Sequence, residues 1–339
     1  MKIKTNDVRR SVVILDKIVR NYKLFRAWER EKTGEKRDWR TYEQHFAKRI
    51  KVAVRELEPL IDESIASINR VKGDLRGRKQ SLSLKQKMIL LFLKQLFGKS
   101  NREMSGMLVA FSLLSDVDVS YKTIERLYSD KEVVLVLNNM HALILKKKGV
   151  ADSDCCGDGT GYSLSIRKHY ASETEKRKEG AKENIGSKMF TYVFTLMDLD
   201  SRMYIGYGSS LKSEKEAYLS AMKMAKATGV NSIRLDRYYS GQSCVKFIEE
   251  NFGDAKIYLI PKKNATITGS WEWKRMLYAF LNNPNKYLHE YFKRNQSESG
   301  FSEDKRRFGR KIPQRKKDTI NTAGFCTTIW HNLFWIATN

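Results

Sequence analysis

Four side chains in the segment YFKRNQSESGFSEDKRRFG, residues 291–309, are of types that handle phosphate groups and metal ions. They are Tyr291, Arg294, Glu298 and Lys305, and on one continuous helix they would fall within roughly 60° of one another. A carboxylate can hold a cation while neighbouring Arg and Lys side chains bind phosphate oxygens. The spacing therefore predicts a metal-binding Glu298 on a phosphate-binding face of a helix.

The same segment carries two further acids, Glu303 and Asp304. In the same helical count Glu303 lies about 140° away from Glu298. We therefore expect both acids to be surface charges that take no part in chemistry. Gly300 is a poor helix former, which weakens the prediction of an unbroken helix.

Two more acids lie in or at the end of expected strands, where a sheet would place them near Glu298. Asp158 begins DGTGYSLS in an expected strand, and Asp236 ends the expected strand SIRLD. Taken singly, Asp158 reads as a turn former and Asp236 as a helix cap. Together with Glu298, the three carboxylates suit a pair of Mg²⁺ ions, roughly 3.5–4 Å apart, of the kind that acts on phosphodiesters. The strand leading into Asp158 also offers Asp152 and Asp154 as rivals.

The elements that must position these acids follow from the pattern beyond residue 150. KMFTYVFTLMDLDSRMYIGYGSS predicts two strands in a hairpin, and a helix from about residue 214 to 227 follows it. Next come a strand at SIRLD, a helix at GQSCVKFIEENFG and a strand at KIYLIP. This order predicts an α/β fold with a mixed sheet flanked by helices.

The first 150 residues predict helices alone. Apolar residues three and four apart, from Trp39 to Ile68, trace one helical stripe with Pro59 inside it. Residues 83–129 predict three short helices, with a Ser100–Glu103 capping box before the second and Ser120 capping the third.

The third of these helices is basic and places three polar side chains outward or at the flank: Lys122, Thr123 and Arg126. A short capped basic helix suits a helix-turn-helix segment whose third helix enters a major groove. The alternative is that the three helices only pack against each other.

Composition favours nucleic acid as the partner. The chain of 339 residues has 64 Lys and Arg against 39 Asp and Glu, a net charge of +25, and 41% hydrophobic residues. Such an excess attracts phosphate, and the apolar fraction is ample for a packed core. No apolar run approaches the roughly 20 residues of a membrane span, and MKIKTNDVRRS has no signal-peptide core. The four cysteines form no CxxC pair, so we expect a cytoplasmic, nucleoid-associated protein without a zinc site.

The three acidic motifs together resemble those of the DDE transposases of prokaryotic insertion sequences. Tyr, two residues, Arg, three residues, Glu, six residues and Lys is the third-motif signature of that family, and residues 291–305 match every spacing. DGTG at Asp158 resembles the first motif, and LDRYYS, with Asp236 and Arg237, resembles the second. The ending TTIWHNLFWI is similar to the helical close of many members. The resemblance covers about residues 150–339.

This resemblance implies a ribonuclease-H-like catalytic domain at 149–339. The helical pattern before it divides into a helical region at 1–78 and the helix-turn-helix-like segment at 79–148. The resemblance also implies Mg²⁺-dependent hydrolysis at the ends of a transposon, with Mn²⁺ as a substitute, and attack of the freed 3′-hydroxyl on target DNA. The catalytic, metal-binding acids would be Asp158, Asp236 and Glu298. The contacts to double-stranded DNA would include Tyr291, Arg294, Lys305 and Arg237. We expect a homodimer on DNA.

Two other functions fit the same motifs. One is a DNA-binding regulator that keeps the fold without catalysis, and the other is a related nuclease without strand transfer. Trp271 and Trp273, in GSWEWKR, either stack on an unpaired base or pack in the core.

Overall fold

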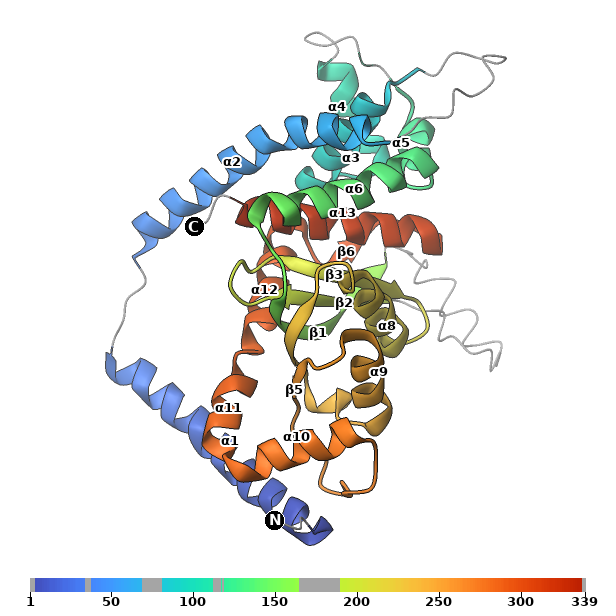
Figure 1. The fold of residues 1–339 in the computed structure, drawn as a ribbon. Helices are drawn as coiled ribbons and strands as arrows, with labels where there is room; N and C mark the ends of the chain where they lie inside the picture. Colours follow the sequence, from blue (N-terminus) through green and yellow to red (C-terminus); the bar gives the residue numbers. More distant parts are fainter. Residues whose placement is uncertain are drawn as a thin grey trace, which may run out of the picture.

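The computed structural model describes residues 4–33, 38–68, 81–111, 117, 119–164 and 190–336. Before the sheet, the described residues form helices alone, as predicted (Figure 1). They are α1 (Thr5–Thr33), α2 (Trp39–Ala66), α3 (Leu84–Phe97), α4 (Asn101–Phe111), α5 (Tyr121–Leu127) and α6 (Lys131–Lys148).

The capping signals in this half are confirmed. Glu103 Oε2 accepts a hydrogen bond from Ser100 N, and Ser100 Oγ accepts one from Glu103 N, so the capping box opens α4. Ser120 Oγ accepts from Thr123 N at the start of α5. Gly98 ends α3 in the left-handed region, at a φ of 60°, which Gly adopts without strain.

The long stripe predicts α2 correctly but not all of its buried face. The helix runs unbroken through Pro59, yet Trp39 at its start is 63% exposed and Val54 is 45% exposed. Leu57 and Ile61 of the stripe are buried as predicted, together with Leu60, which the stripe did not include. The apolar spacing predicts Trp39 to be a core residue, but Trp39 lies outside the core.

The sheet is mixed, as predicted. Its strands are β1 (Ser153–Leu164), β2 (Phe190–Asp198), β3 (Tyr204–Ser210), β4 (Val230–Arg234), β5 (Lys256–Tyr258) and β6 (Lys311–Ile312). They run in the order β3-β2-β1-β4-β5, and β6 pairs with the far end of β1. Strand β1 is antiparallel to β2, which forms the predicted hairpin with β3, and parallel to β4.

Six helices follow the hairpin and pack around the sheet. They are α8 (Glu214–Ala225), α9 (Gln242–Phe252), α10 (Trp271–Asn282), α11 (Pro284–Phe292), α12 (Asn295–Phe308) and α13 (Lys317–Trp335) within the described part of the chain. Helix α8 lies on β2 and β3, whereas α12 crosses β1 and β2. Helix α1 lies beside α10, at the end of the molecule away from α3, α4 and α5 (Figure 1).

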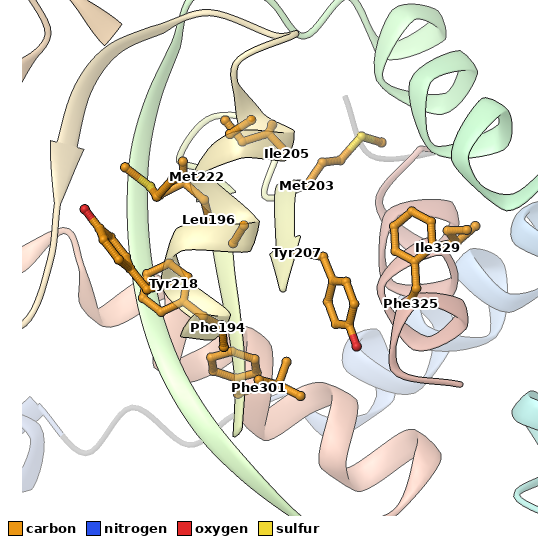
Figure 2. Close-up of a cluster of buried hydrophobic side chains, with 14 of the residues drawn as sticks. Phe194, Leu196, Met203, Ile205, Tyr207, Tyr218, Met222, Phe301, Phe325 and Ile329 are labelled. Carbon is orange, nitrogen blue, oxygen red and sulfur yellow. The ribbon is translucent and has the colours of Figure 1, made fainter. Parts of the chain in front are cut away.

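One continuous hydrophobic core joins the helical half to the sheet. Helix α13 lies between them, packed on β3 and on α2, α3 and α6 (Figure 1). Figure 2 shows Tyr207 of β3 between the sheet and α13, where its ring stacks beside Phe325. On the other side, Trp330 Nε1 donates a hydrogen bond of 3.0 Å to the carbonyl of Phe92 in α3. The two halves therefore share α13 as their central element.

A buried polar cluster fixes α12 against α13 and β3. Asp304 is only 2% exposed; its Oδ2 accepts a hydrogen bond of 2.9 Å from the Tyr204 hydroxyl, and its Oδ1 lies 2.8 Å from His331 Nδ1. His331 Nε2 donates to the carbonyl of Arg202 at 2.9 Å. Both ring nitrogens therefore face oxygen atoms, Nε2 a backbone carbonyl and Nδ1 the Asp304 carboxylate.

The prediction that Asp304 and Glu303 are free surface charges is therefore wrong. Asp304 belongs to the buried cluster, and Glu303, whose side chain is 17% exposed, forms ion pairs with Arg49 of α2 and Arg307. A helical wheel of one segment cannot show that α13 and α2 cover the face opposite Glu298.

Gly300 does not interrupt α12; it lets the helix approach the sheet closely. A Cβ atom at this position would lie 2.7 Å from the Tyr204 hydroxyl oxygen and closer still to Met197 Cε. Tyr204 cannot easily move away, because Asp304 holds its hydroxyl.

We therefore expect Gly300→Ala to lower the free energy of unfolding by roughly 1–3 kcal/mol through overpacking. Gly106→Ala is the matched control, since Gly106 lies in α4 and a Cβ atom added there would meet no atom within 4 Å. At that position Ala should stabilise by about 0.5–1 kcal/mol. Denaturant midpoints of the two variants test this. Equal shifts of the same sign would show that α12 has room at Gly300.

Candidate active site

The four residues of the third motif lie on two helices rather than one. Tyr291 is buried in the last turn of α11, Arg294 precedes α12, and Glu298 and Lys305 belong to α12. Between the helices, Arg294 N bonds to the carbonyl of Tyr291, and Ser297 N bonds to that of Arg294. These bonds span three residues, so the backbone tightens into 3₁₀ turns there.

The tightening has a local cause in the sequence. Ser297 Oγ donates a second hydrogen bond, of 2.7 Å, to the carbonyl of Arg294 and competes with the regular helical pattern. The prediction of one unbroken helix is therefore wrong at Lys293 and Arg294, not at Gly300. The break turns Arg294 toward the acids of the sheet.

Asp158 lies in the middle of β1, the strand between β2 and β4. Its Oδ1 accepts a hydrogen bond of 2.9 Å from Gly159 N. The pKa of Asp158 is raised to about 6, chiefly by burial and in smaller part by the charges of Glu298 and Asp236, while the hydrogen bond from Gly159 N and the charge of Arg294 lower it. The three acids of the three motifs therefore lie near enough to act on one another's charge.

Asp236 follows β4, the strand parallel to β1, as predicted. It precedes the short helical turn Arg237–Tyr239, but its side chain makes no capping hydrogen bond to that turn. The alternative of a helix cap is therefore set aside. Of the rivals, Asp154 accepts a hydrogen bond from Ser232 Oγ, whereas the charges acting on Asp158 are those of Arg294, Glu298 and Asp236.

Arg294 is the centre of the cluster. Its Nη1 lies 3.0 Å from Glu298 Oε1 and its Nη2 lies 3.7 Å from Asp236 Oδ1. The guanidinium also lies 5.6 Å from the ring centre of Tyr291. Burial alone would lower the pKa of Arg294, but Tyr291 and the three acids raise it. Its Nε is buried without a hydrogen-bond partner among the described residues.

Lys305 continues the site along β1. Its ammonium group donates a hydrogen bond to Thr160 Oγ1 and lies 5.2 Å from the ring centre of Tyr162, and burial lowers its pKa. Thr160 and Tyr162 follow Asp158 at steps of two, so all three share one face of the strand. The three acidic motifs do not indicate Thr160 and Tyr162, but this alternation along the strand is the signal that places them beside Asp158.

Arg237 has protein partners in this structure. Its Nε and Nη2 donate to the carbonyl of Pro261 at 3.2 and 3.1 Å, and its Nη1 lies 2.9 Å from Asp16 Oδ1 of α1. Lys263 adds a second, more distant pair with Asp16. The side chain next to Asp236 thus ties α1 to the loop after β5.

The remaining predicted residues lie elsewhere. Lys122 and Arg126 are exposed on α5 in the helical half, with Thr123 half-buried and Ile124 and Leu127 inward, as predicted.

Trp273 packs in the core and its Nε1 donates to the carbonyl of Thr266, whereas Trp271 is 72% exposed at the start of α10. Core packing is therefore the correct interpretation for Trp273 only.

The acids suit a divalent cation by chemistry but not by their present spacing. Carboxylate oxygens are what Mg²⁺ prefers, and an ion would favour the charged form of Asp158. In the part of the chain that the structure describes, however, no three His, Cys, Asp or Glu side chains come together closely enough to hold an ion. Arg294, with its two ion pairs, lies between the acids instead.

A comparison with known proteins gives the family. The chain is 41% identical over 287 residues to the probable transposase for insertion sequence element ISA1214 of Archaeoglobus fulgidus, and the match covers 84% of each chain. The chain belongs to the insertion-sequence transposases. No family model matches it. Among the described helices of this transposase, none is long and apolar enough to cross a membrane.

The raised pKa of Asp158 predicts how the stability of the transposase depends on pH. The unfolded carboxyl ionises near 3.8 and the folded one near 6, so the native state binds the extra proton and wild-type stability falls between pH 4 and 6. Asp158→Asn, which keeps the acceptor for Gly159, should leave stability unchanged below pH 4. Above pH 6 it should stabilise by about 1–3 kcal/mol.

Thermal unfolding with a chelator present, at several pH values, measures this difference. Asp154→Asn serves as the control on the same strand. A stabilisation by Asp158→Asn that is equally large at pH 3.5 and pH 7.5 would contradict the proposed electrostatic origin.

Proposed function

We propose that this transposase is a DDE enzyme with a ribonuclease-H-like catalytic domain. It would bind the two ends of its insertion sequence, cleave them by divalent-cation-dependent hydrolysis and join the 3′-hydroxyls to target DNA. The observation that carries the proposal is the convergence of Asp158, Asp236 and Glu298 on one arginine. Asp158 lies in the central strand, Asp236 follows the parallel strand β4, and Glu298 lies in α12, which packs on β1 and β2. Asp236 and Glu298 pair with Arg294, whose charge also acts on Asp158.

The order of the strands supports this assignment. Strand β4 ends at Arg234, which pairs with Cys156 in the first half of the longer strand β1, so the end of β4 lies beside the middle of β1, where Asp158 stands. Function in open sheets collects at such strand ends. Helix α12 then adds the third acid from a remote part of the chain.

The roles of the residues follow from their chemistry. Asp158, Asp236 and Glu298 would hold Mg²⁺, for which Mn²⁺ would substitute, and the bound cation supplies charge stabilisation at the phosphorus being attacked. Arg294 and Lys305 would grip the phosphates on either side of the scissile bond. Tyr291, buried beside Arg294, orients that guanidinium. Hydrolysis breaks the bond to the 3′-oxygen, and the freed hydroxyl becomes the nucleophile toward target DNA.

Recognition of DNA is proposed for α5 and the helices that support it. Lys122 and Arg126 are exposed, while Ile124 and Leu127 anchor the helix to α3 and α4. A basic outer face on an apolar anchor is the arrangement of a recognition helix. Since an element has two ends, we propose that two copies act together on DNA.

Glu298→Gln should abolish cleavage and joining, with losses on the order of 10³-fold or more, while binding to the ends persists. Glu298 is half-exposed, so the neutral side chain should not disturb folding. Glu250→Gln, an exposed change of the same kind on α9, is the matched control.

Cleavage and joining on duplexes that carry the element's ends, with band shifts on the same preparations, measure these effects. Wild-type protein that binds the ends but never cuts them would indicate a regulator. Cutting without joining would indicate a nuclease.

Lys122→Ala and Arg126→Ala should each weaken binding to the ends. Loss of one phosphate contact should also reduce the slope of log affinity against log salt by about one unit. Lys226→Ala, exposed at the end of α8, removes the same charge as a control. If both α5 variants bind like the control across the salt series, recognition belongs to another element.

A further inference from the structure

Arg294 occupies the position of a cation among the three acids. Its two terminal nitrogens lie 3.0 Å from Glu298 Oε1 and 3.7 Å from Asp236 Oδ1, and its side chain is only 17% exposed. These two carboxylates are therefore neutralised, in part, by a residue of the same chain. In this arrangement, the described acids do not gather closely enough to hold an ion.

The guanidinium is not held as a structural arginine is held. Arg234 on β4 is 2% exposed, and its guanidinium donates hydrogen bonds to Glu290, Ser232 and the carbonyl of Cys155. Arg294 has no hydrogen bond to a backbone carbonyl among the described contacts, and its buried Nε has no partner there. Its partners are two half-exposed acids, at 42% and 52%, so the pairs are individually weak.

The backbone at Arg294 also allows the side chain to change place. It lies in the 3₁₀ junction between α11 and α12, where hydrogen bonds span three residues instead of four. Such junctions inside helical segments often mark hinges. Arg294 thus combines weak acidic partners, one unused donor and a junction in the backbone.

We propose that Arg294 couples cation binding to DNA binding: it neutralises Asp236 and Glu298 in the free protein and releases them when a DNA phosphate takes the guanidinium. A phosphate offers Arg a bidentate partner and satisfies Nε as well. The acids are then free to close on a divalent cation. This inference rests on the proposed function, because it takes the three acids as the cation site.

The coupling is reciprocal by linkage. If DNA raises the affinity for the cation by some factor, the cation raises the affinity for DNA by the same factor, typically 5- to 150-fold. A free transposase would then bind divalent ions weakly at this site, and hydrolysis would be confined to complexes in which DNA is already seated. The charge of Arg294, rather than a separate lid, would keep the free protein from hydrolysing phosphodiesters before DNA is bound.

The test is the affinity for Mn²⁺ without DNA, followed by electron paramagnetic resonance of the free ion. Arg294→Gln should bind Mn²⁺ about tenfold more tightly than wild type, since the competing charge is gone. Arg306→Gln, an exposed arginine on α12, is the control with the same change of charge. Arg294→Lys keeps the positive charge but lacks the guanidinium group, and its Mn²⁺ affinity should stay near that of wild type. This variant guards against the possibility that Arg294→Gln is misfolded.

A second arm measures the affinity for a duplex carrying the element's end, with and without Mn²⁺, by fluorescence anisotropy. The enhancement by Mn²⁺ should be at least about fivefold in wild type and in Arg306→Gln, and close to one in Arg294→Gln.

One outcome would overturn the coupling and leave the proposed function intact: wild type and Arg294→Gln bind Mn²⁺ with equal affinity, and adding Asp158→Asn to either protein abolishes that binding. No Mn²⁺ binding that depends on Asp158, with or without DNA, would overturn the proposed function itself.

Discussion

The buried pair of Asp304 and His331 is the constraint on which the site geometry depends. An ionisable pair at 2–3% exposure is tolerated only if its remaining hydrogen-bonding atoms are satisfied, and here Tyr204 and the carbonyl of Arg202 satisfy them. These contacts admit one rotation and one height of α12 against α13 and β3. With that register fixed, Glu298 and Lys305 can only lie along β1, beside Asp158 and Thr160.

The site itself works against the stability that its scaffold supplies. Three carboxylates, one of them on a strand at the centre of the sheet, repel one another and lose water, and the raised pKa of Asp158 records both effects. Arg294 relieves part of this repulsion but leaves its own Nε unsatisfied. Polar groups that are strained by burial and by like charge are typical of sites where substrate or cofactor completes the set of partners.

The sequence predicted the elements well because their signals are local. The caps at Ser100 and Ser120, the hairpin and the order of strands and helices all follow from residues within a few positions of each other. The motifs also single out Asp158, Asp236 and Glu298 by their spacing, and in the structure the charges of the other two acids act on Asp158.

The errors concern contacts between distant segments. Nothing near Asp304 in the chain reveals His331 and Tyr204, so the local sequence wrongly predicts a surface charge there. The pairing of Arg294 with Asp236, which lies almost 60 residues earlier in the chain, likewise has no local signal. Ser297 shows a third kind of error, since its hydroxyl changes the hydrogen bonding of the helix that a regular wheel assumes.

The central place of α13 has a consequence for biosynthesis. Every other described element precedes this helix in the chain, yet α2, α3, α6 and β3 all pack against it, and Trp330 closes on the carbonyl of Phe92. Domains emerging from the ribosome generally fold from the N-terminus onward. Here neither the N-terminal helices nor the sheet can complete its core until residues 317–335 have been translated. In a nascent chain, the helices and the sheet would therefore lack their packing against α13, and the acids would lack their final positions. All of these would form in one late step, once α13 is available.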